Sequence, residues 1–311
     1  MGLAFLFPGQ GSQFVGMGKD FYEKFEIVKK TFDEASEVLG FSISRLCFEG
    51  PEEELKKTYN TQPAILTMSV SLNRMLNNDG IYPDIVAGHS LGEYSALVSA
   101  GVLAFSDAVY LVRKRGEFMQ EASPLGLGSM YAIVGLPREK VEEICRQASS
   151  LGVVEPANFN SEKQIVISGE VKALEKAGEL AKEAGAKRVV PLSVSAPFHS
   201  SLMSEVGEKM RKEIEKVKLS DAKVPVIANY NAKALTKKEE ILEALIKQID
   251  NPVLWVDSMK LLAQKVNFAL EVGPGKVLRG LMRDIDRNVK VMDIGKIELY
   301  EKAKEAILKD E

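Results

Sequence analysis

Hydrophobic positions fall into two patterns, short apolar runs and longer segments in which apolar residues recur every three to four positions. The short runs predict buried strands and the longer segments predict amphipathic helices. Strands are expected at residues 3–7 and 85–87, and helices at 19–39, from Thr61 onward, from the Ser90 stretch onward and at 106–119. Thr61 is placed at a helix start because threonine favours a cap and the nearby Pro63 suits a first turn. Strands that alternate with helices indicate a parallel α/β sheet.

The pattern changes between residues 126 and 194. This segment predicts strands at 129–135, 153–159, 164–168 and 187–194, and helices at 137–149 and 171–184. The order βαββαβ is that of a ferredoxin-like unit. The α/β pattern then resumes, with strands at 224–228 and 268–272 and a last helix from Ile297. We therefore predict a hydrolase-like α/β core, residues 1–125 and 195–311, with a ferredoxin-like subdomain inserted at 126–194.

Composition and charge indicate which kinds of binding partner and which cellular compartment to expect. The chain has 311 residues, with 41 lysines and arginines, 44 aspartates and glutamates, and a net charge of −3. This balance argues against bulk binding of nucleic acid or of an anionic membrane. Cys47 and Cys145 stand alone without metal-like spacing, so we expect reduced thiols in a cytoplasmic protein. The apolar run at residues 3–7 does not fit a signal peptide, and no run reaches the roughly 20 residues that span a bilayer.

The segment Gly88-His89-Ser90-Leu91-Gly92 joins a predicted strand to a predicted helix. This order is typical of a nucleophile elbow, in which a strained turn exposes a serine hydroxyl. The alternative is a helix cap, because Ser90 and Glu93 have the spacing of a capping box. A cap does not require Gly92, since glycine in the first turn costs about 1 kcal/mol relative to alanine. The pattern favours the nucleophile.

A serine nucleophile needs a base, and histidine is the usual one near neutral pH. The chain has two histidines. His89 adjoins the serine and is interpreted as structural, so His199 becomes the base by elimination. The interval between Ser90 and His199 contains several carboxylates, but none stands out as the third member of a triad. A backbone or amide oxygen is the alternative partner for the imidazole.

Arg115 lies on an apolar helix face. Ala108, Val112, Arg115 and Met119 recur at helical spacing, whereas the charged neighbours lie toward the other side. Arginine is almost never fully buried without a partner, and a guanidinium matches a carboxylate bidentately. The partner is either an internal carboxylate or the carboxylate of a ligand, and the sequence leaves both open.

Two glycine-rich loops follow predicted strands. The loop Pro8-Gly9-Gln10-Gly11 fits an oxyanion-forming loop, so the backbone amides of Leu91 and Gln10 are the expected donors. A nucleotide site is disfavoured there, because phenylalanine stands where the dinucleotide pattern needs its third glycine. The loop 273–276 lacks the serine or threonine of a Walker motif and is interpreted as a strand-to-helix turn.

Together these segments resemble the malonyl-CoA:acyl-carrier-protein transacylases of fatty-acid synthesis. The resemblance covers nearly the whole chain, in family order, through "FLFPGQGSQ" (residues 5–13), "TQPA", "GHSLGEYSAL", "RGEFMQ", "ANFNS", "PFHS", "NPVLW" and "EVGPGKVL". It implies a hydrolase-like α/β core with an inserted ferredoxin-like subdomain, in agreement with the pattern of elements.

The resemblance also implies roles for individual residues. Ser90 is the acylated nucleophile, His199 the base and Arg115 the receptor of the malonyl carboxylate. The backbone carbonyl of Gln248 orients the histidine, and the two loop amides named above form the oxyanion hole. The other residues that it places near the substrate are Met119, Asn160, Val194 and Phe198.

The implied activity is a ping-pong transfer of malonyl from coenzyme A to the phosphopantetheine thiol of acyl carrier protein. The expected partners are malonyl-CoA and acyl carrier protein, with no cofactor, no metal, no nucleic acid and no membrane, and the expected state is a monomer. Three alternatives stay open: a serine hydrolase or thioesterase that uses the same pair, an acyltransferase for another acyl group such as methylmalonyl, and a non-catalytic interaction module.

Overall fold

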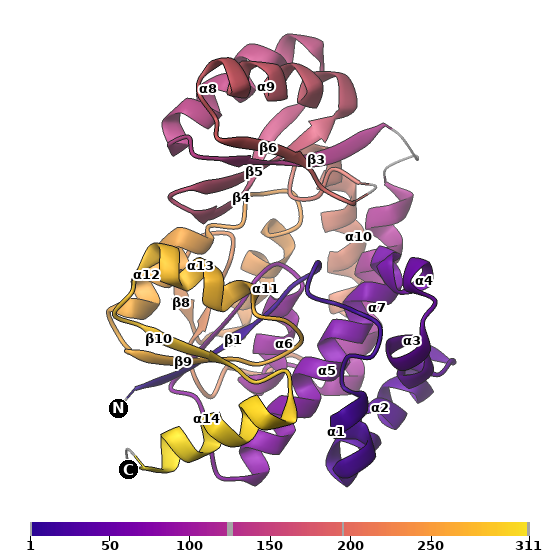
Figure 1. Cartoon of the computed structure of the whole chain (residues 1–311). Coiled ribbons are helices and arrows are strands. Elements are labelled where there is room, and N and C mark those ends of the chain that lie inside the picture. Colours follow the sequence, from indigo (N-terminus) through magenta and orange to yellow (C-terminus); the bar gives the residue numbers. More distant parts are fainter. Residues whose placement is uncertain (1, 123–126, 195, 310–311) are drawn as a thin grey trace.

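The computed structural model describes residues 2–122, 127–194 and 196–309. Two sheets organise these residues (Figure 1). The larger sheet has the strand order β10-β9-β1-β2-β7-β8 and is parallel except for the antiparallel pair β7·β8. Its strands are β1 (Leu3–Phe7), β2 (Ile85–Gly88), β7 (Val226–Ile227), β8 (Ala234–Leu235), β9 (Phe268–Glu271) and β10 (Lys290–Asp293).

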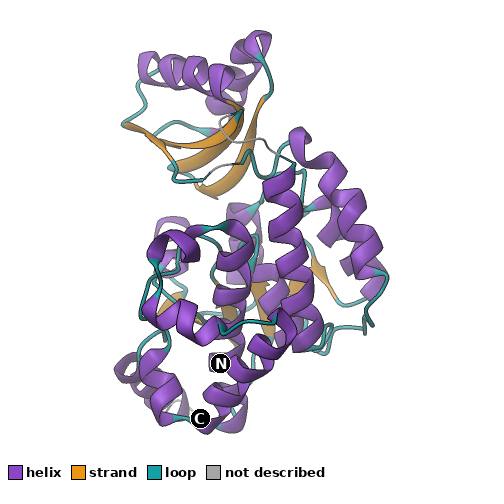
Figure 2. Ribbon diagram, turned by 90° about the vertical axis from the view of Figure 1, so that its right-hand side faces the viewer, coloured by secondary structure: helices purple, strands orange, loops and turns teal. Residues whose placement is uncertain are grey.

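The central strand β1 is buried on both faces, as its five apolar residues require. Leu3, Phe5 and Phe7 pack into one hydrophobic cluster, and Ala4 and Leu6 pack into a second cluster on the other face. Helices surround the larger sheet (Figure 2), some of them packed on other helices and not on the strands themselves. They are α1 (Lys19–Lys24), α2 (Glu26–Leu39), α3 (Ile43–Glu49), α4 (Glu52–Lys56), α5 (Thr58–Asn78), α6 (Gly92–Ser99), α7 (Phe105–Glu121), α10 (Ser204–Ile214), α11 (Lys238–Lys247), α12 (Trp255–Ala263), α13 (Val277–Ile285) and α14 (Ile297–Lys309), with a 3₁₀ turn at Ser201–Met203.

The predicted helix start at Thr61 is wrong. Helix α5 begins at Thr58 and contains Pro63 in its interior. Proline has no N–H to donate to the carbonyl four residues earlier, which is that of Tyr59. The Arg113 Nη1 donates to this carbonyl instead, at 3.1 Å. A side chain from α7 thus satisfies the backbone group that proline leaves without its helical partner.

The smaller sheet is antiparallel, with the order β4-β5-β3-β6. Its elements are β3 (Gly128–Val134), α8 (Arg138–Ala148), a 3₁₀ turn at Ser149–Leu151, β4 (Val154–Ser161), β5 (Gln164–Glu170), α9 (Val171–Glu183) and β6 (Arg188–Pro191). Helices α8 and α9 cover the face directed away from the larger sheet (Figure 1) and bury a separate hydrophobic cluster against it. The order βαββαβ and the ferredoxin-like strand order are confirmed.

The smaller sheet is attached to the core next to the predicted site. The Val253 amide donates to the Ala157 carbonyl of β4 at 2.9 Å, and the Phe159 amide donates back to the Val253 carbonyl at 3.0 Å. Met130, Ala132, Ala157 and Val166 of the smaller sheet belong to the same hydrophobic cluster as β1, so the face that α8 and α9 leave uncovered is directed toward the core. The predicted domain boundaries at residues 125, 126 and 195 lie outside the described residues, so that division stays a prediction.

Candidate active site

The candidate nucleophile lies at the carboxyl edge of the larger sheet. Ser90 follows β2, and Gln10 follows β1, the parallel strand paired with β2. Ligand sites of open parallel sheets form in crevices at this edge. Both residues line one cavity of about 100 Å³.

Ser90 adopts the left-handed backbone conformation of a nucleophile elbow, with φ of 50°. Such a conformation costs a non-glycine residue about 1–3 kcal/mol. The two glycines of the motif are needed for close packing. A β carbon on Gly88 would collide with the Gly92 carbonyl, and one on Gly92 would collide with the Phe7 carbonyl. The helix-cap alternative is wrong, because α6 has no side-chain cap and the Ser90 hydroxyl contacts other groups.

His199 lies against the serine. Its Nε2 is 2.7 Å from Ser90 Oγ, and its Nδ1 is 2.8 Å from the backbone carbonyl oxygen of Gln248. A carbonyl only accepts, so Nδ1 carries the proton and Nε2 accepts the serine hydroxyl. The missing triad acid is thereby replaced by a carbonyl oxygen.

The imidazole is strongly biased toward its neutral form. His199 is buried and also has a left-handed φ, of 58°. Burial, and to a smaller extent the positive charge of Arg115, lowers the His199 pKa to about 3. A neutral imidazole is the form that can accept a proton, so the site holds an unprotonated base at neutral pH.

Arg115 reaches the same oxygen from helix α7. Its Nη2 donates to Ser90 Oγ at 3.1 Å and to Gln248 Oε1 at 2.9 Å, while its Nη1 donates to Gln62 Oε1 at 2.9 Å. The side chain is 2 % exposed. Across the part of the chain that the structure describes, no carboxylate forms an ion pair with it. The internal ion pair that the sequence left open is thus not formed.

The Arg115 guanidinium keeps an unused N–H donor and a positive charge that no ion pair within the described residues neutralises. Its Nε is buried and has no hydrogen-bond partner among the residues that the structure describes. Burial lowers the Arg115 pKa, and the nearby Tyr94 and Glu93 oppose this shift. The Tyr94 ring centroid lies 5.8 Å from the guanidinium carbon. A buried cation held by neutral amide oxygens favours an anionic ligand.

The predicted oxyanion donors face the same cavity. Gln10 and Leu91 both line it. Among the hydrogen bonds of the described residues, none is donated by the backbone amide of either residue. The Gln10 side chain is held separately, with Nε2 donating to Thr58 Oγ1 at 3.2 Å. Both amides therefore remain available to a ligand oxygen.

The remaining predicted residues lie in or next to the cavity. Met119, Val194 and Phe198 line it. Asn160 does not line it, because its Oδ1 is 2.7 Å from His89 Nε2 and it lies behind that ring. The lining residue of this strand is Asn158. His89 is buried against Trp255, at 5.2 Å between ring centroids, and burial lowers its pKa, as expected for a structural histidine.

Comparison with known proteins places this geometry in a family. The acyl transferase domain model matches residues 4–293. The chain belongs to the acyl transferase family. It is 51 % identical over 303 residues to the malonyl CoA-acyl carrier protein transacylase of Bacillus subtilis, covering 97 % of this chain and 96 % of that protein. The Escherichia coli protein of the same name is 50 % identical over 284 residues, covering 91 % and 92 %.

Solved structures of acyl transferases agree with the fold. A malonyl-transacylase in complex with a type II PKS acyl-carrier protein has a TM-score of 0.96 at 43 % identity, covering 98 % of this chain and 100 % of that one. The acyl carrier protein S-malonyltransferase of Vibrio cholerae has a TM-score of 0.95 at 44 % identity, covering 97 % and 100 %. The predicted α/β fold class and the predicted family are confirmed.

The second glycine-rich loop of this acyl transferase is a strand-to-helix turn, as predicted. Residues 273–276 connect β9 to α13. The Leu278 and Arg279 amides at the start of α13 donate to the Glu271 carboxylate, at 3.0 and 2.8 Å. An internal anion thus occupies the helix N-terminus that a phosphate would need.

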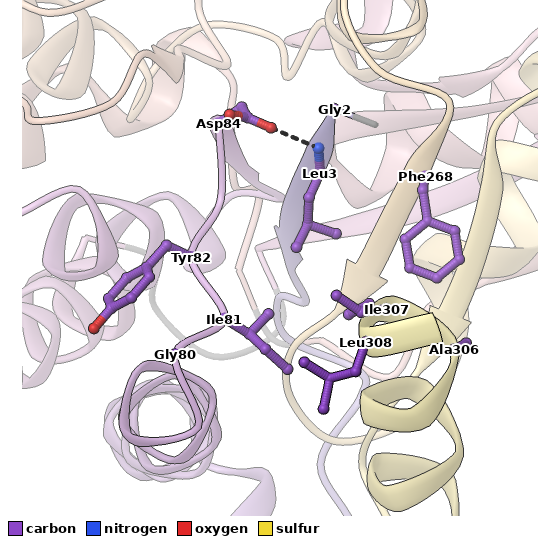
Figure 3. Close-up of a pocket in the computed structure, with 10 residues that line it drawn as sticks. All are labelled: Gly2, Leu3, Gly80, Ile81, Tyr82, Asp84, Phe268, Ala306, Ile307 and Leu308. Carbon is purple, nitrogen blue, oxygen red and sulfur yellow. Dashed lines mark hydrogen bonds between the residues drawn. The ribbon is translucent and has the colours of Figure 1, made fainter. Parts of the chain in front are cut away.

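A second cavity, of about 350 Å³, lies beside the first residues of β1 and the end of α14 (Figure 3). Its polar wall includes Asp84, whose carboxylate accepts the Leu3 amide at 2.8 Å. It lies at the amino end of β1, the opposite end of that strand from Gln10. We assign no part of the acyl transfer to it.

Sequence reasoning missed four polar residues around the site. They are Gln62, Glu93, Asn158 and Asn229, each buried. Gln62 had a detectable signal, because it is a polar residue that directly precedes the apolar run 63–66. In the described part of the chain, no group of three or more metal-ligating side chains is placed to hold an ion, and no helix has the length and apolarity to cross a membrane.

Proposed function

We propose that this protein is a malonyl-CoA:acyl-carrier-protein transacylase that works through an acyl-serine at Ser90. One observation carries the proposal: Ser90 Oγ is contacted both by His199 Nε2, at 2.7 Å, and by Arg115 Nη2, at 3.1 Å. A nucleophile, a base and a carboxylate receptor therefore share one cavity. The names of the curated relatives, at 51 % and 50 % identity, support the same activity.

The first half-reaction is acylation. His199 Nε2 takes the proton of the Ser90 hydroxyl as Oγ attacks the thioester carbon. The tetrahedral intermediate collapses, the carbon–sulfur bond breaks, and the imidazolium returns its proton to the thiolate of coenzyme A. The carbonyl of Gln248 holds Nδ1–H at 2.8 Å throughout and keeps the ring oriented.

The oxyanion of the intermediate forms between two backbone amides. Gln10 and Leu91 supply these donors in the proposal, since both line the cavity and neither amide donates a hydrogen bond to another described residue. Loss of one such donor typically costs about 2.7–4 kcal/mol of transition-state stabilisation.

Selectivity for malonyl comes from Arg115. The malonyl carboxylate pairs with the guanidinium, whereas an acetyl group leaves the buried cation without an anion. Sites built around a polar partner can reject analogues that lack it by about 10⁴-fold. The cavity volume of about 100 Å³ fits a short acyl group, and Met119, Val194 and Phe198 form its apolar wall.

The second half-reaction transfers the malonyl group to a thiol. His199 deprotonates the phosphopantetheine thiol of acyl carrier protein, which attacks the acyl-serine, and Ser90 recovers its proton as the ester bond breaks. A related transacylase solved with its acyl-carrier protein supports this partner. We further propose that the enzyme acts in the cytoplasm, as a monomer and without a cofactor.

A thiol-competition experiment tests the function against the hydrolase alternative. The enzyme is mixed with radiolabelled malonyl-CoA and holo acyl carrier protein, and malonyl-carrier protein and free malonate are measured separately. The proposal predicts that the label moves mainly to the carrier protein. Release of free malonate as the main product, at the same rate with and without the carrier protein, would identify a hydrolase instead.

A further inference from the structure

The strained backbone of Ser90 is held on both sides by amide side chains. Its N–H donates to Asn229 Oδ1 at 2.6 Å, and its carbonyl accepts from Gln248 Nε2 at 2.9 Å. Asn229 Nδ2 also donates to the Gly88 carbonyl at 2.7 Å, which ties it to the strand that leads into the elbow. These bonds come from two loops that are distant from Ser90 in the sequence.

Both amide residues are in turn held by one carboxylate oxygen. Glu93 Oε2 accepts from Gln248 Nε2 at 2.8 Å and from the Asn229 backbone amide at 3.1 Å. Glu93 is 1 % exposed and lies one turn after Ser90 at the start of α6. A buried carboxylate is costly, and the acyl-transfer steps above assign it no task.

The Glu93 carboxylate, together with the Ser90 carbonyl, fixes which way the Gln248 amide points. An ionised carboxylate accepts and does not donate, so the amide must turn its NH₂ toward Glu93. Its oxygen then points to Arg115 Nη2, at 2.9 Å. Glu93 therefore contacts Arg115 only indirectly, through the neutral Gln248 amide. The guanidinium is not paired with Glu93 and can still bind a ligand carboxylate.

We propose that Glu93 is a positioning residue, which acts through Gln248 and Asn229 to hold Ser90 in its reactive conformation and Arg115 in its orientation. The assignment rests on the proposed function for its substrate, but not for the positioning of Ser90. The ionised carboxylate is the competent form, since it accepts the hydrogen bonds from Gln248 Nε2 and from the Asn229 amide more strongly than a neutral carboxyl does.

The test compares Glu93→Gln with Glu271→Gln. Glu271 is also a fully buried glutamate whose carboxylate accepts two protein N–H groups, and burial raises the pKa of both carboxyls to about 7. Glu93→Gln is expected to lower kcat for malonyl transfer about 10- to 100-fold with KM changed less than about threefold, because misplaced reacting groups lose rate. Glu271→Gln is expected to keep kcat and KM within about twofold of the wild type.

The pH profile separates positioning from a merely structural role. The titratable groups that interact with Glu93 among the described residues are Arg115 from α7 and Tyr94 from its own helix, and burial raises the Tyr94 pKa to about 12. Neither titrates near neutral pH. Wild type and Glu271→Gln are expected to lose kcat/KM as the pH falls below about 7, whereas Glu93→Gln stays flat at its reduced level. A Glu93→Gln enzyme with wild-type kcat and wild-type profile would overturn the assignment.

A second variant covers the case in which Glu93→Gln does not fold. Gln248→Met removes the side-chain amide and keeps the backbone carbonyl that contacts His199. Because Glu93 acts through this amide, Gln248→Met is expected to reproduce most of the loss in kcat. Unchanged kcat in Gln248→Met would contradict the proposal.

Acylation of Ser90 by p-nitrophenyl acetate separates this proposal from the proposed function. This ester needs a positioned serine and no arginine. If the wild-type enzyme reacts with the ester but not with malonyl-CoA, the proposed function fails, and the Glu93 assignment still predicts slower acylation by the ester in Glu93→Gln. Equal acylation rates in wild type and Glu93→Gln would contradict the assignment alone.

Discussion

Arg115 Nη2 lies 3.1 Å from Ser90 Oγ, the oxygen that also contacts His199 Nε2 at 2.7 Å. The carboxylate receptor and the nucleophile are therefore in direct contact before any ligand binds. A malonyl carboxylate that pairs with Arg115 takes this donor away from the serine. It also neutralises a charge that lowers the His199 pKa, so the bound substrate strengthens the base that it needs.

Removal of the guanidinium should abolish acyl selectivity. In Arg115→Ala, kcat/KM for malonyl transfer should fall by about 10³-fold or more, and that for acetyl transfer by less than about tenfold, since acetyl has no carboxylate to lose. Steady-state transfer from the two acyl-CoA donors to a carrier thiol measures both values. Equal losses for malonyl and acetyl would contradict the role of Arg115.

An internal carboxylate beside Arg115 should compete with the substrate. Gln62 Oε1 accepts from Arg115 Nη1 at 2.9 Å, so Gln62→Glu places an anion at contact distance from the guanidinium. We expect kcat/KM for malonyl transfer to fall about 100-fold, with acetyl transfer changed only a few-fold. Gln62→Leu serves as the control, because it removes the bond without adding a charge and should cost malonyl transfer only about tenfold. Equal malonyl transfer by the two variants would exclude competition for the guanidinium.

The glycine at the start of α6 should be required for folding. A β carbon on Gly92 would meet the Phe7 carbonyl, and this backbone belongs to the central strand. We expect Gly92→Ala to lose about 3 kcal/mol or more of unfolding free energy, measured by urea titration. Gly280 in α13 is the matched control, since a β carbon there meets nothing within 4 Å. Gly280→Ala should be neutral or stabilising by up to about 1 kcal/mol. Similar stabilities of the two variants would show that the elbow does not need its close approach.

Buried neutral His199 should make the fold sensitive to acid. Its pKa falls from an ordinary 6.5 to about 3 in the folded protein, so the unfolded chain binds a proton between these values and the folded chain does not. Its contribution to stability is therefore complete above pH 6.5 and is lost as the pH falls toward 3.

The test compares wild type with His199→Gln in urea at two pH values. From pH 7 to about pH 5, the wild type should lose about 2 kcal/mol more unfolding free energy than His199→Gln. The difference between the two proteins removes the contributions of the other titrating groups, which both proteins share. An identical pH dependence in both proteins would show that folding does not lower the His199 pKa.

Much of the architecture follows from local pattern. The apolar run 3–7, the βαββαβ order and the strand–serine–helix join each depend on residues close in sequence, and each appears in the fold. The strands β8 and β10 were not predicted. The first has two residues, and the second has charged residues at both ends, so each depends on its partner strand.

The polar contacts of the site were harder to predict. Ser90, His199 and Arg115 could be predicted from the sequence. Ser90 lies in a recognisable strand–serine–helix motif, the chain has few histidines, and an arginine on an apolar helix face is unusual. Glu93, Asn229 and the side chain of Gln248 converge from three separate elements. Their convergence is set by tertiary packing, and no spacing in the sequence reports it. The sequence likewise could not show that, within the described part of the chain, no carboxylate forms an ion pair with Arg115.

The most direct test of the central claim is intact-mass analysis after mixing the enzyme with malonyl-CoA. The account predicts one added malonyl group on the wild-type protein, mapped to Ser90 by peptide analysis, and none on Ser90→Ala. A malonyl adduct that persists in Ser90→Ala, or a wild-type enzyme that transfers malonyl to carrier protein without ever carrying it, would contradict the acyl-serine mechanism.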